Sequence, residues 1–152
     1  MSTTPKQVKS AALLWAVAVA AGVAETGLAV TEIASEGGLE AGVWVNIGLR
    51  SLVYTGAALL VVLFTQGRRW ARVGLAVLLS TIGLASMVVP PALAMADGEG
   101  FVDAFGSGGE LAVPFLAVRM VHIAAVVVAT ALMFTPSANA HFRKDRLEPV
   151  TP

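Results

Sequence analysis

Four ionisable side chains lie inside long apolar stretches of the sequence and are the first candidates for chemistry. They are Glu25, Arg50, Arg119 and His122. A charge at the centre of a membrane helix costs about 3 kcal/mol on insertion scales, so such residues usually face a bundle interior and pair with one another. One carboxylate among arginines can form a buried ion pair, help to bind an anionic ligand, or exchange protons in a transporter.

The composition of the chain is typical of membrane proteins. Of its 152 residues, 57% are hydrophobic and only 13% are charged, whereas soluble domains carry about 25% charged residues. The chain has no cysteine, which excludes disulfide bonds and thiolate metal sites. Its basic residues form short clusters without a nucleic-acid-binding motif, so the expected partner is the lipid bilayer and not a nucleic acid.

Four segments are long enough to cross a bilayer, whose hydrocarbon core is about 30 Å thick and needs roughly 20 apolar residues. They span about residues 10–33, 42–65, 70–91 and 111–134. We therefore predict an all-α fold in which residues 1–152 form a single membrane domain, a four-helix transmembrane bundle.

The ends of these segments raise three questions. The start of the chain, with two lysines before an apolar stretch and GVA before Glu25, is also similar to a cleaved secretory signal. We favour an uncleaved helix because the apolar pattern continues past Glu25 to Ile33. Pro90 and Pro91 are expected to end the third helix, since proline disrupts helical hydrogen bonding. In the 92–110 connector, the FVDAF stretch fits a short surface helix or a flexible loop equally well.

The distribution of lysine and arginine indicates the orientation of the bundle. The two tails and the second connector contain these basic residues: Lys6, Lys9, Arg68, Arg69, Arg72, Arg143, Lys144 and Arg146. The first and third connectors contain none. Because short basic loops stay in the cytoplasm, we predict a plasma-membrane protein with N-in/C-in topology. Residues 1–9 and 135–152 are then cytoplasmic tails, and residues 92–110 form an outer loop.

This topology places the buried charges at one depth. At a rise of 1.5 Å per residue, Glu25 lies ~22 Å from the inner end of its helix. Arg50 and Arg119 each lie ~12 Å from the outer ends of theirs, with His122 one turn deeper. We expect Glu25 to pair with both arginines in a polar layer within the outer half of the membrane.

Spacing adds further residues to this layer. Asn46, Arg50 and Tyr54 recur every four residues and therefore share one helix face. The third segment carries no charge in its apolar run, and we expect it to serve packing. A stripe of small residues on the first helix favours close helix contacts in lipid; it consists of Ala18, Gly22 and Thr26.

The polar layer has three interpretations. In the one we favour, buried ion pairs form a structural clasp that fixes which helices adjoin and in what register. In the second, the layer lines a pocket open to the outside, where surplus positive charge binds an anionic or polar ligand. In the third, Glu25 couples protons in an exporter, because AETGLAV is similar to the first helix of small multidrug-resistance transporters. The arginines argue against the third interpretation, since they would hold the carboxylate ionised.

The sequence contains no pattern of an enzyme site. No Ser-His-Asp grouping, metal-ligand cluster or glycine-rich phosphate loop is present. The two histidines, His122 and His141, lie ~28 Å apart on an ideal helix and cannot bind one haem. We therefore expect no enzymatic activity, no cofactor and no metal site. The expected protein is a non-enzymatic membrane protein, as a homo-oligomer or an accessory subunit of a larger membrane assembly. The alternative is a small transporter or membrane ligand-binding protein.

The most specific segments of the chain are GRRWAR, after the second predicted helix, and VRMVHIAAVVVATALMFTPSANAHFR near the end. Together with LLWAVAVAAGVAET and LRSLVYTGAALLVV, they resemble small four-span membrane proteins of high-GC Gram-positive bacteria, which have no assigned activity. The resemblance implies an integral plasma-membrane protein and adds weight to Glu25, Arg50, Arg119 and His122. It implies no substrate, cofactor or reaction.

The PSANAHFR segment, residues 136–143, is expected to mark the point where the fourth helix leaves the bilayer. Asn139 and Phe142 would then fold against the turn formed by residues 68–72. The alternative is a tail that docks a partner.

Overall fold

The computed structural model describes residues 4–38, 40–106 and 109–143, which form helices and no strands. Four spans in it are long and apolar enough to cross a membrane, and they confirm the predicted all-α bundle. The helices are α1 (Lys6–Glu36), α2 (Ala41–Thr65), α3 (Arg69–Leu75), the π-helix η1 (Ala76–Gly83), α4 (Leu84–Ala96), α5 (Phe101–Gly106), α6 (Ala112–Met133) and α7 (Pro136–Arg143). Helices α3, η1 and α4 form one continuous third span.

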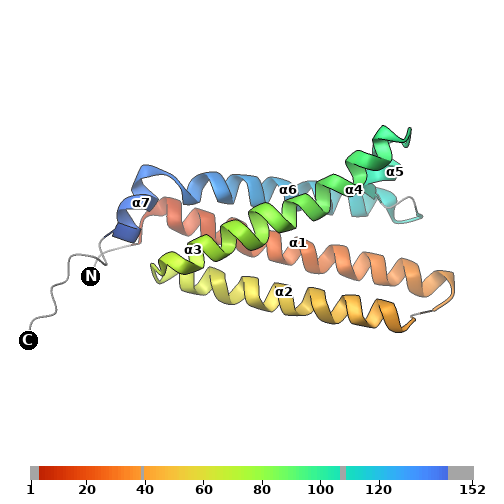
Figure 1. Ribbon diagram of the computed structural model, residues 1–152, viewed down its shortest axis with the longest axis horizontal. Coiled ribbons are helices and arrows are strands. Elements are labelled where there is room, and N and C mark those ends of the chain that lie inside the picture. Colours follow the sequence, from red (N-terminus) through yellow and green to blue (C-terminus); the bar gives the residue numbers. More distant parts are fainter. Residues whose placement is uncertain (1–3, 39, 107–108, 144–152) are drawn as a thin grey trace, which may run out of the picture.

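Helix α1 is the centre of the bundle, because it packs against both α6 and α2. The third span crosses the others obliquely, from α2 at one end to α5 and α6 at the other (Figure 1). The start of α1 and the short helix α7 lie at the same end of the bundle, as an even number of spans requires. The side of the membrane on which this end lies stays a prediction.

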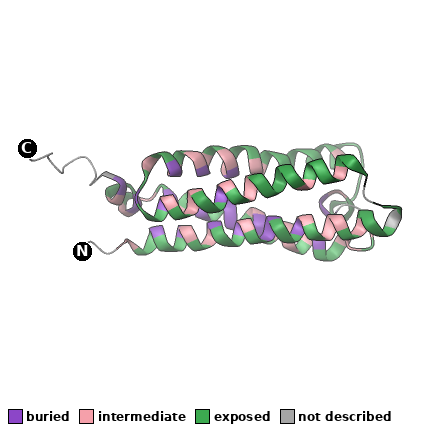
Figure 2. Cartoon of the chain, turned by 90° about the horizontal axis from the view of Figure 1, so that it is seen from below, coloured by how far each residue is buried: buried purple, intermediate pink, exposed green. Residues whose placement is uncertain are grey.

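The largest fully buried side chains gather in the half of the bundle nearest α7. All four spans contribute to this core, with Val8, Trp15, Phe64, Leu75, Val126 and Met133. Exposed residues run along the outward faces of the helices (Figure 2), and many of them are large and apolar. At most 28% of the most apolar 18-residue stretch of any span is buried within the protein. Lipid is the environment that suits such faces, so the fold is that of a multi-pass membrane protein.

The prediction that Pro90 and Pro91 end the third helix is wrong. Helix α4 continues through both prolines and ends at Ala96. In lipid a broken helix would expose unpaired backbone groups, so proline within a span is tolerated where neighbouring structure compensates. The residue with left-handed backbone that terminates the helix is Gly98, two positions after Ala96, with a φ of +101°. Its N–H and that of Glu99 bond back to the carbonyls of Met95 and Ala94, a glycine-terminated C-cap.

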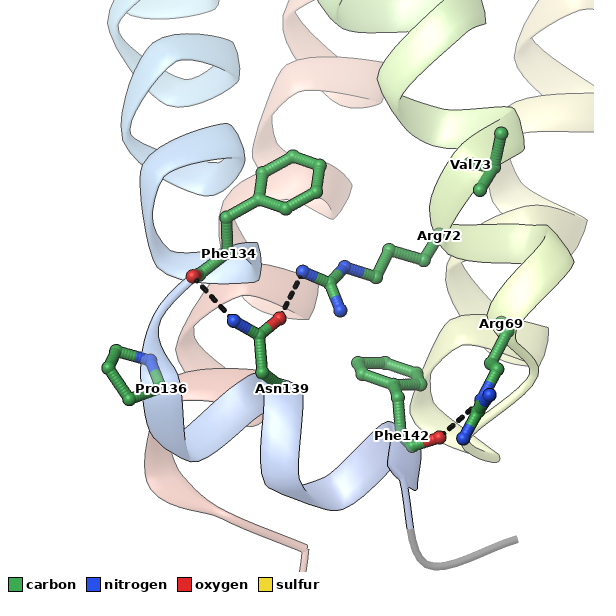
Figure 3. Close-up of a pocket in the computed structure, with 7 residues that line it drawn as sticks. All are labelled: Arg69, Arg72, Val73, Phe134, Pro136, Asn139 and Phe142. Atoms are coloured by element: carbon green, nitrogen blue, oxygen red, sulfur yellow. Dashed lines mark hydrogen bonds between the residues drawn. The ribbon is translucent and has the colours of Figure 1, made fainter. Parts of the chain in front are cut away.

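Two segments outside the spans, FVDAF and PSANAHFR, are helical. FVDAF lies in α5, which packs against α4 and α6. The PSANAHFR segment is α7, and the predicted folding of Asn139 and Phe142 against residues 68–72 is confirmed. Arg72 Nη2 donates to Asn139 Oδ1 at 2.5 Å, and Arg69 Nε donates to the carbonyl of Phe142 (Figure 3). The tail basic residues Lys144 and Arg146 lie outside the described residues.

Candidate functional site

Glu25 is the most buried charged residue that the described structure contains, with 4% of its surface exposed. Its Oε1 lies 2.9 Å from Nδ1 of His122, and its Oε2 lies 3.7 Å from Nε of Arg119. With the carboxylate ionised, the imidazole N–H is the donor of the shorter contact. Both partners come from α6, one helical turn apart, so the carboxylate of α1 is held by a single neighbouring helix.

Arg119 is fixed in place by more than the carboxylate. Its Nη1 donates to the carbonyl of Phe105 in α5 at 3.1 Å, and its guanidinium carbon lies 4.5 Å from the centroid of the Phe115 ring. The guanidinium therefore joins α1, α5 and α6. No sequence pattern assigns Phe105 or Phe115 to the polar layer; the two aromatic residues of FVDAF are a signal for Phe105 alone.

The expected ion pair between Glu25 and Arg50 is not formed. Arg50 is exposed on α2, and its Nε donates to Oδ1 of Asn46 at 2.9 Å. The two α2 residues are one turn apart, so this hydrogen bond forms within their own helix. Both oxygens of Glu25 are meanwhile directed at α6. The predicted pairing of Glu25 is therefore confirmed for Arg119 and wrong for Arg50.

Tyr54 is the residue through which α2 reaches the centre of the bundle. Its hydroxyl donates to the carbonyl of Gly22 at 2.7 Å and lies 2.9 Å from Oγ1 of Thr26. A Cβ atom at Gly22 would lie 2.8 Å from Cε1 of Tyr54 and 3.1 Å from Cε1 of His122. The absence of a side chain at this position is therefore what allows α2 and α6 to approach α1 at the level of the polar cluster.

A cavity of about 330 Å³ lies beside this cluster, between α1, α2, the third span and α6. Its polar lining includes all six residues that the sequence assigned to the layer: Glu25, Asn46, Arg50, Tyr54, Arg119 and His122. Its apolar lining includes Leu79, Ile82 and Met87 of the third span. The third span runs obliquely past α2, and the cavity lies between them. The sequence does not predict this cavity, because a run of apolar residues does not indicate the angle at which two helices cross.

The charges around the cavity do not balance. Glu25 contributes one negative charge, and Arg50 and Arg119 contribute two positive charges. Glu25 and Arg119 form one pair, so the charge of Arg50 is the surplus on the cavity wall. Chemically, such a wall suits a carboxylate or phosphate group. Among the described residues, no group of three or more His, Asp or Glu side chains could hold a metal ion.

Comparisons with protein-family models, curated proteins and solved structures find no match to this chain. The resemblance to four-span proteins of high-GC Gram-positive bacteria thus stays a prediction. The function must be argued from the geometry of the polar cluster and its cavity.

Proposed function

We propose that the protein is a non-enzymatic integral membrane protein of the plasma membrane, in which Glu25, Arg119 and His122 act mainly as a structural clasp. The observation that carries this proposal is the burial of Glu25, 4% exposed, with one oxygen directed at each of two α6 side chains. A buried charge that loses its partner is strongly destabilising, whereas the intact pair fixes arrangement more than it adds stability.

The contacts around the clasp support a role in register. Glu25 meets α6 at two positions one turn apart, and Arg119 extends the link to α5. Sliding α1 along α6 by one turn would break both contacts with the carboxylate. The clasp thus favours one alignment of the two helices over its neighbours.

A double-mutant cycle tests the clasp. Glu25→Gln should lower the free energy of unfolding of the detergent-solubilised protein by on the order of 3 kcal/mol, because Arg119 keeps a buried charge without its counter-ion. Adding Arg119→Gln should restore part of this loss, with a coupling of about 0.5–3 kcal/mol. Wild-type stability of Glu25→Gln together with loss of a transport activity would contradict the clasp.

Arg50→Gln is the matched control for this cycle. It removes an arginine from the same cavity, but one whose hydrogen bond is to Asn46 of its own helix and not to Glu25. Its effect on the unfolding free energy should stay within about 0.5 kcal/mol, the usual range for residues outside a buried network. Additive effects of Glu25→Gln with Arg119→Gln, or a loss with Arg50→Gln as large as with Arg119→Gln, would refute a specific clasp.

The second candidate is a membrane ligand-binding protein or small transporter that uses the same layer. The surplus charge of Arg50 on the wall of a 330 Å³ cavity favours it. Under this candidate, Arg50→Gln leaves stability unchanged but abolishes binding of a small carboxylate or phosphate. A shift in the unfolding temperature on adding such an anion, present in the wild type and absent in Arg50→Gln, distinguishes the two functions.

The proposal includes membership of a larger membrane assembly or a homo-oligomer. Helix α2 supports this part, because its main contacts are with α1 and α3 alone. Trp44, Leu52 and Leu59 on it are each at least 59% exposed. Lipid or a neighbouring membrane helix must cover this apolar face.

A further inference from the structure

A second pocket lies at the opposite end of the bundle from the polar cluster, where the α2–α3 turn meets α7. It measures about 690 Å³ and lies between α3, the end of α6 and α7 (Figure 3). Arg69 and Arg72 line it together with Phe134, Asn139 and Phe142. The residues of the polar layer have no part in it, so its chemistry is separate from the clasp.

The pocket lies at the ends of two membrane spans. The third span begins at Arg69 and the fourth ends at Met133, which places these arginines at the level where the apolar spans meet water. Trp70, next to Arg69, is 59% exposed, as suits a tryptophan anchored among lipid headgroups. Phe134 and Val73 are exposed on the rim by 52% and 61%. The rim therefore offers apolar surface to an acyl chain, and the interior offers positive charge.

The charge of the pocket is of one sign. None of the described residues that line it is acidic. Arg68 is exposed on the adjoining turn, and Lys6 and Lys9 are exposed in the first turns of α1, at the same end of the bundle. The surroundings thus attract an anion, and the lining residues that the structure describes offer no carboxylate to a cationic headgroup.

The two guanidinium groups have donors left over. Arg72 uses Nη2 on Asn139, and Arg69 uses Nε on the Phe142 carbonyl. Arg69 Nη2 and Arg72 Nε are buried without a hydrogen-bond acceptor among the described residues. The other terminal nitrogen of Arg72 points into the space between Asn139 and Phe142 (Figure 3). Arginine donates hydrogen bonds to phosphate oxygens, and this terminal nitrogen of Arg72 is the donor that faces a phosphate entering the pocket.

Aromatic rings hold the Arg72 guanidinium in position for this role. Its carbon lies 4.4 Å from the centroid of the Phe134 ring and 5.3 Å from that of Phe142. Such cation–π contacts orient a guanidinium without using its hydrogen-bond donors. Arg72 is thus preorganised, and binding a phosphate requires little ordering of this side chain.

We propose that this pocket binds the phosphate of an anionic phospholipid, with Arg69 and Arg72 as its ligands and the exposed Phe134 against the lipid chain. The position at the span ends and the apolar rim favour a lipid over a soluble phosphate. The single sign of the charge favours an anionic headgroup over a zwitterionic one.

Native mass spectrometry of the detergent-solubilised full chain tests the site. The protein is titrated with phosphatidylglycerol, with phosphatidylcholine, and with inorganic phosphate. We expect retention of phosphatidylglycerol by the wild type and about fivefold weaker retention by Arg72→Gln, the effect of one basic side chain at an anionic membrane surface. Lys9→Gln is the control, because it removes one charge at the same end without touching the pocket.

Each alternative outcome overturns the proposal. Equal retention of phosphatidylcholine and phosphatidylglycerol by the wild type refutes an anionic-lipid site. Full displacement of phosphatidylglycerol by an equal concentration of inorganic phosphate identifies a soluble-phosphate site instead. An equal loss in Lys9→Gln and Arg72→Gln shows attraction to net charge alone. If Arg72→Gln does not yield folded protein, Arg69→Gln replaces it, and the two wild-type comparisons decide independently of any variant.

Discussion

Gly22 offers the sharpest test of how closely the helices meet at the polar cluster. A methyl group there would lie 2.8 Å from Cε1 of Tyr54 and 3.1 Å from Cε1 of His122. Carbon atoms in contact normally lie about 3.5–4.0 Å apart, so Gly22→Ala must displace the Tyr54 ring and press on that of His122. Overpacking of this kind costs about 1–3 kcal/mol. The Tyr54 hydrogen bond to the Gly22 carbonyl, 2.7 Å long, would be strained by the same movement.

Gly27→Ala is the matched control in the same helix. A methyl group at Gly27 meets no atom within 4 Å. Both substitutions gain helix propensity of up to about 1 kcal/mol, so this term cancels when the two variants are compared. We therefore expect Gly22→Ala to be about 1–3 kcal/mol less stable than Gly27→Ala.

The assay is unfolding of the detergent-solubilised protein in a sodium dodecyl sulfate titration. Tryptophan fluorescence reports loss of packing when Trp44 and Trp70, both exposed, are replaced by Phe in all variants, so that the fully buried Trp15 is the fluorophore. Placing both variants in a Tyr54→Ala background should shrink the difference, because the nearer of the two clashing atoms is then absent. Equal stability of Gly22→Ala and Gly27→Ala, or no change in their difference without the Tyr54 ring, would refute the close approach.

The remaining predictions concern orientation and assembly. Because the chain has no cysteine, a single cysteine placed at an exposed connector position reports topology. An impermeant maleimide should label Asp97→Cys on intact cells. The same reagent should label Gln66→Cys only after the cells are permeabilised. The reverse pattern would contradict cytoplasmic termini. The mass of the full chain in mild detergent should exceed that of one copy, as an oligomer or larger assembly requires; a mass of one chain would remove that part of the proposal.

The sequence predicts the spans of this fold because the bilayer sets one requirement, a run of apolar residues of fixed length. Span ends depend on finer chemistry. The prediction is that Pro90 and Pro91 stop the third helix, but the helix continues through both. Breaking it in lipid would leave several backbone groups unpaired, which costs more than the hydrogen bonding lost at proline. The helix ends at Ala96, and Gly98, with its positive φ, provides the cap that follows.

Depth and direction are separate properties of a buried charge, and only depth can be counted along a sequence. Counting residues along each helix places Glu25 at the level of Arg119, and the structure brings Glu25 Oε2 within 3.7 Å of Arg119 Nε. Counting could not tell that Arg50 would turn to Asn46, one turn away on its own helix. Tyr54 of α2 packs on Gly22 of α1, a contact between uncharged groups that no charge pattern reveals.

The polar layer therefore has two halves with different consequences. On the α6 side, Glu25 is hydrogen-bonded to His122 and ion-paired with Arg119, and all three side chains are largely buried. On the α2 side, Arg50 lies exposed on a cavity wall, and Tyr54 bonds to Gly22 and Thr26 of α1 beside the cluster. A structural clasp needs the first half alone, since removing Arg50 leaves every contact of Glu25 in place. The second half is the part that a ligand would use, so the two functions depend on different arginines and can be separated by single substitutions.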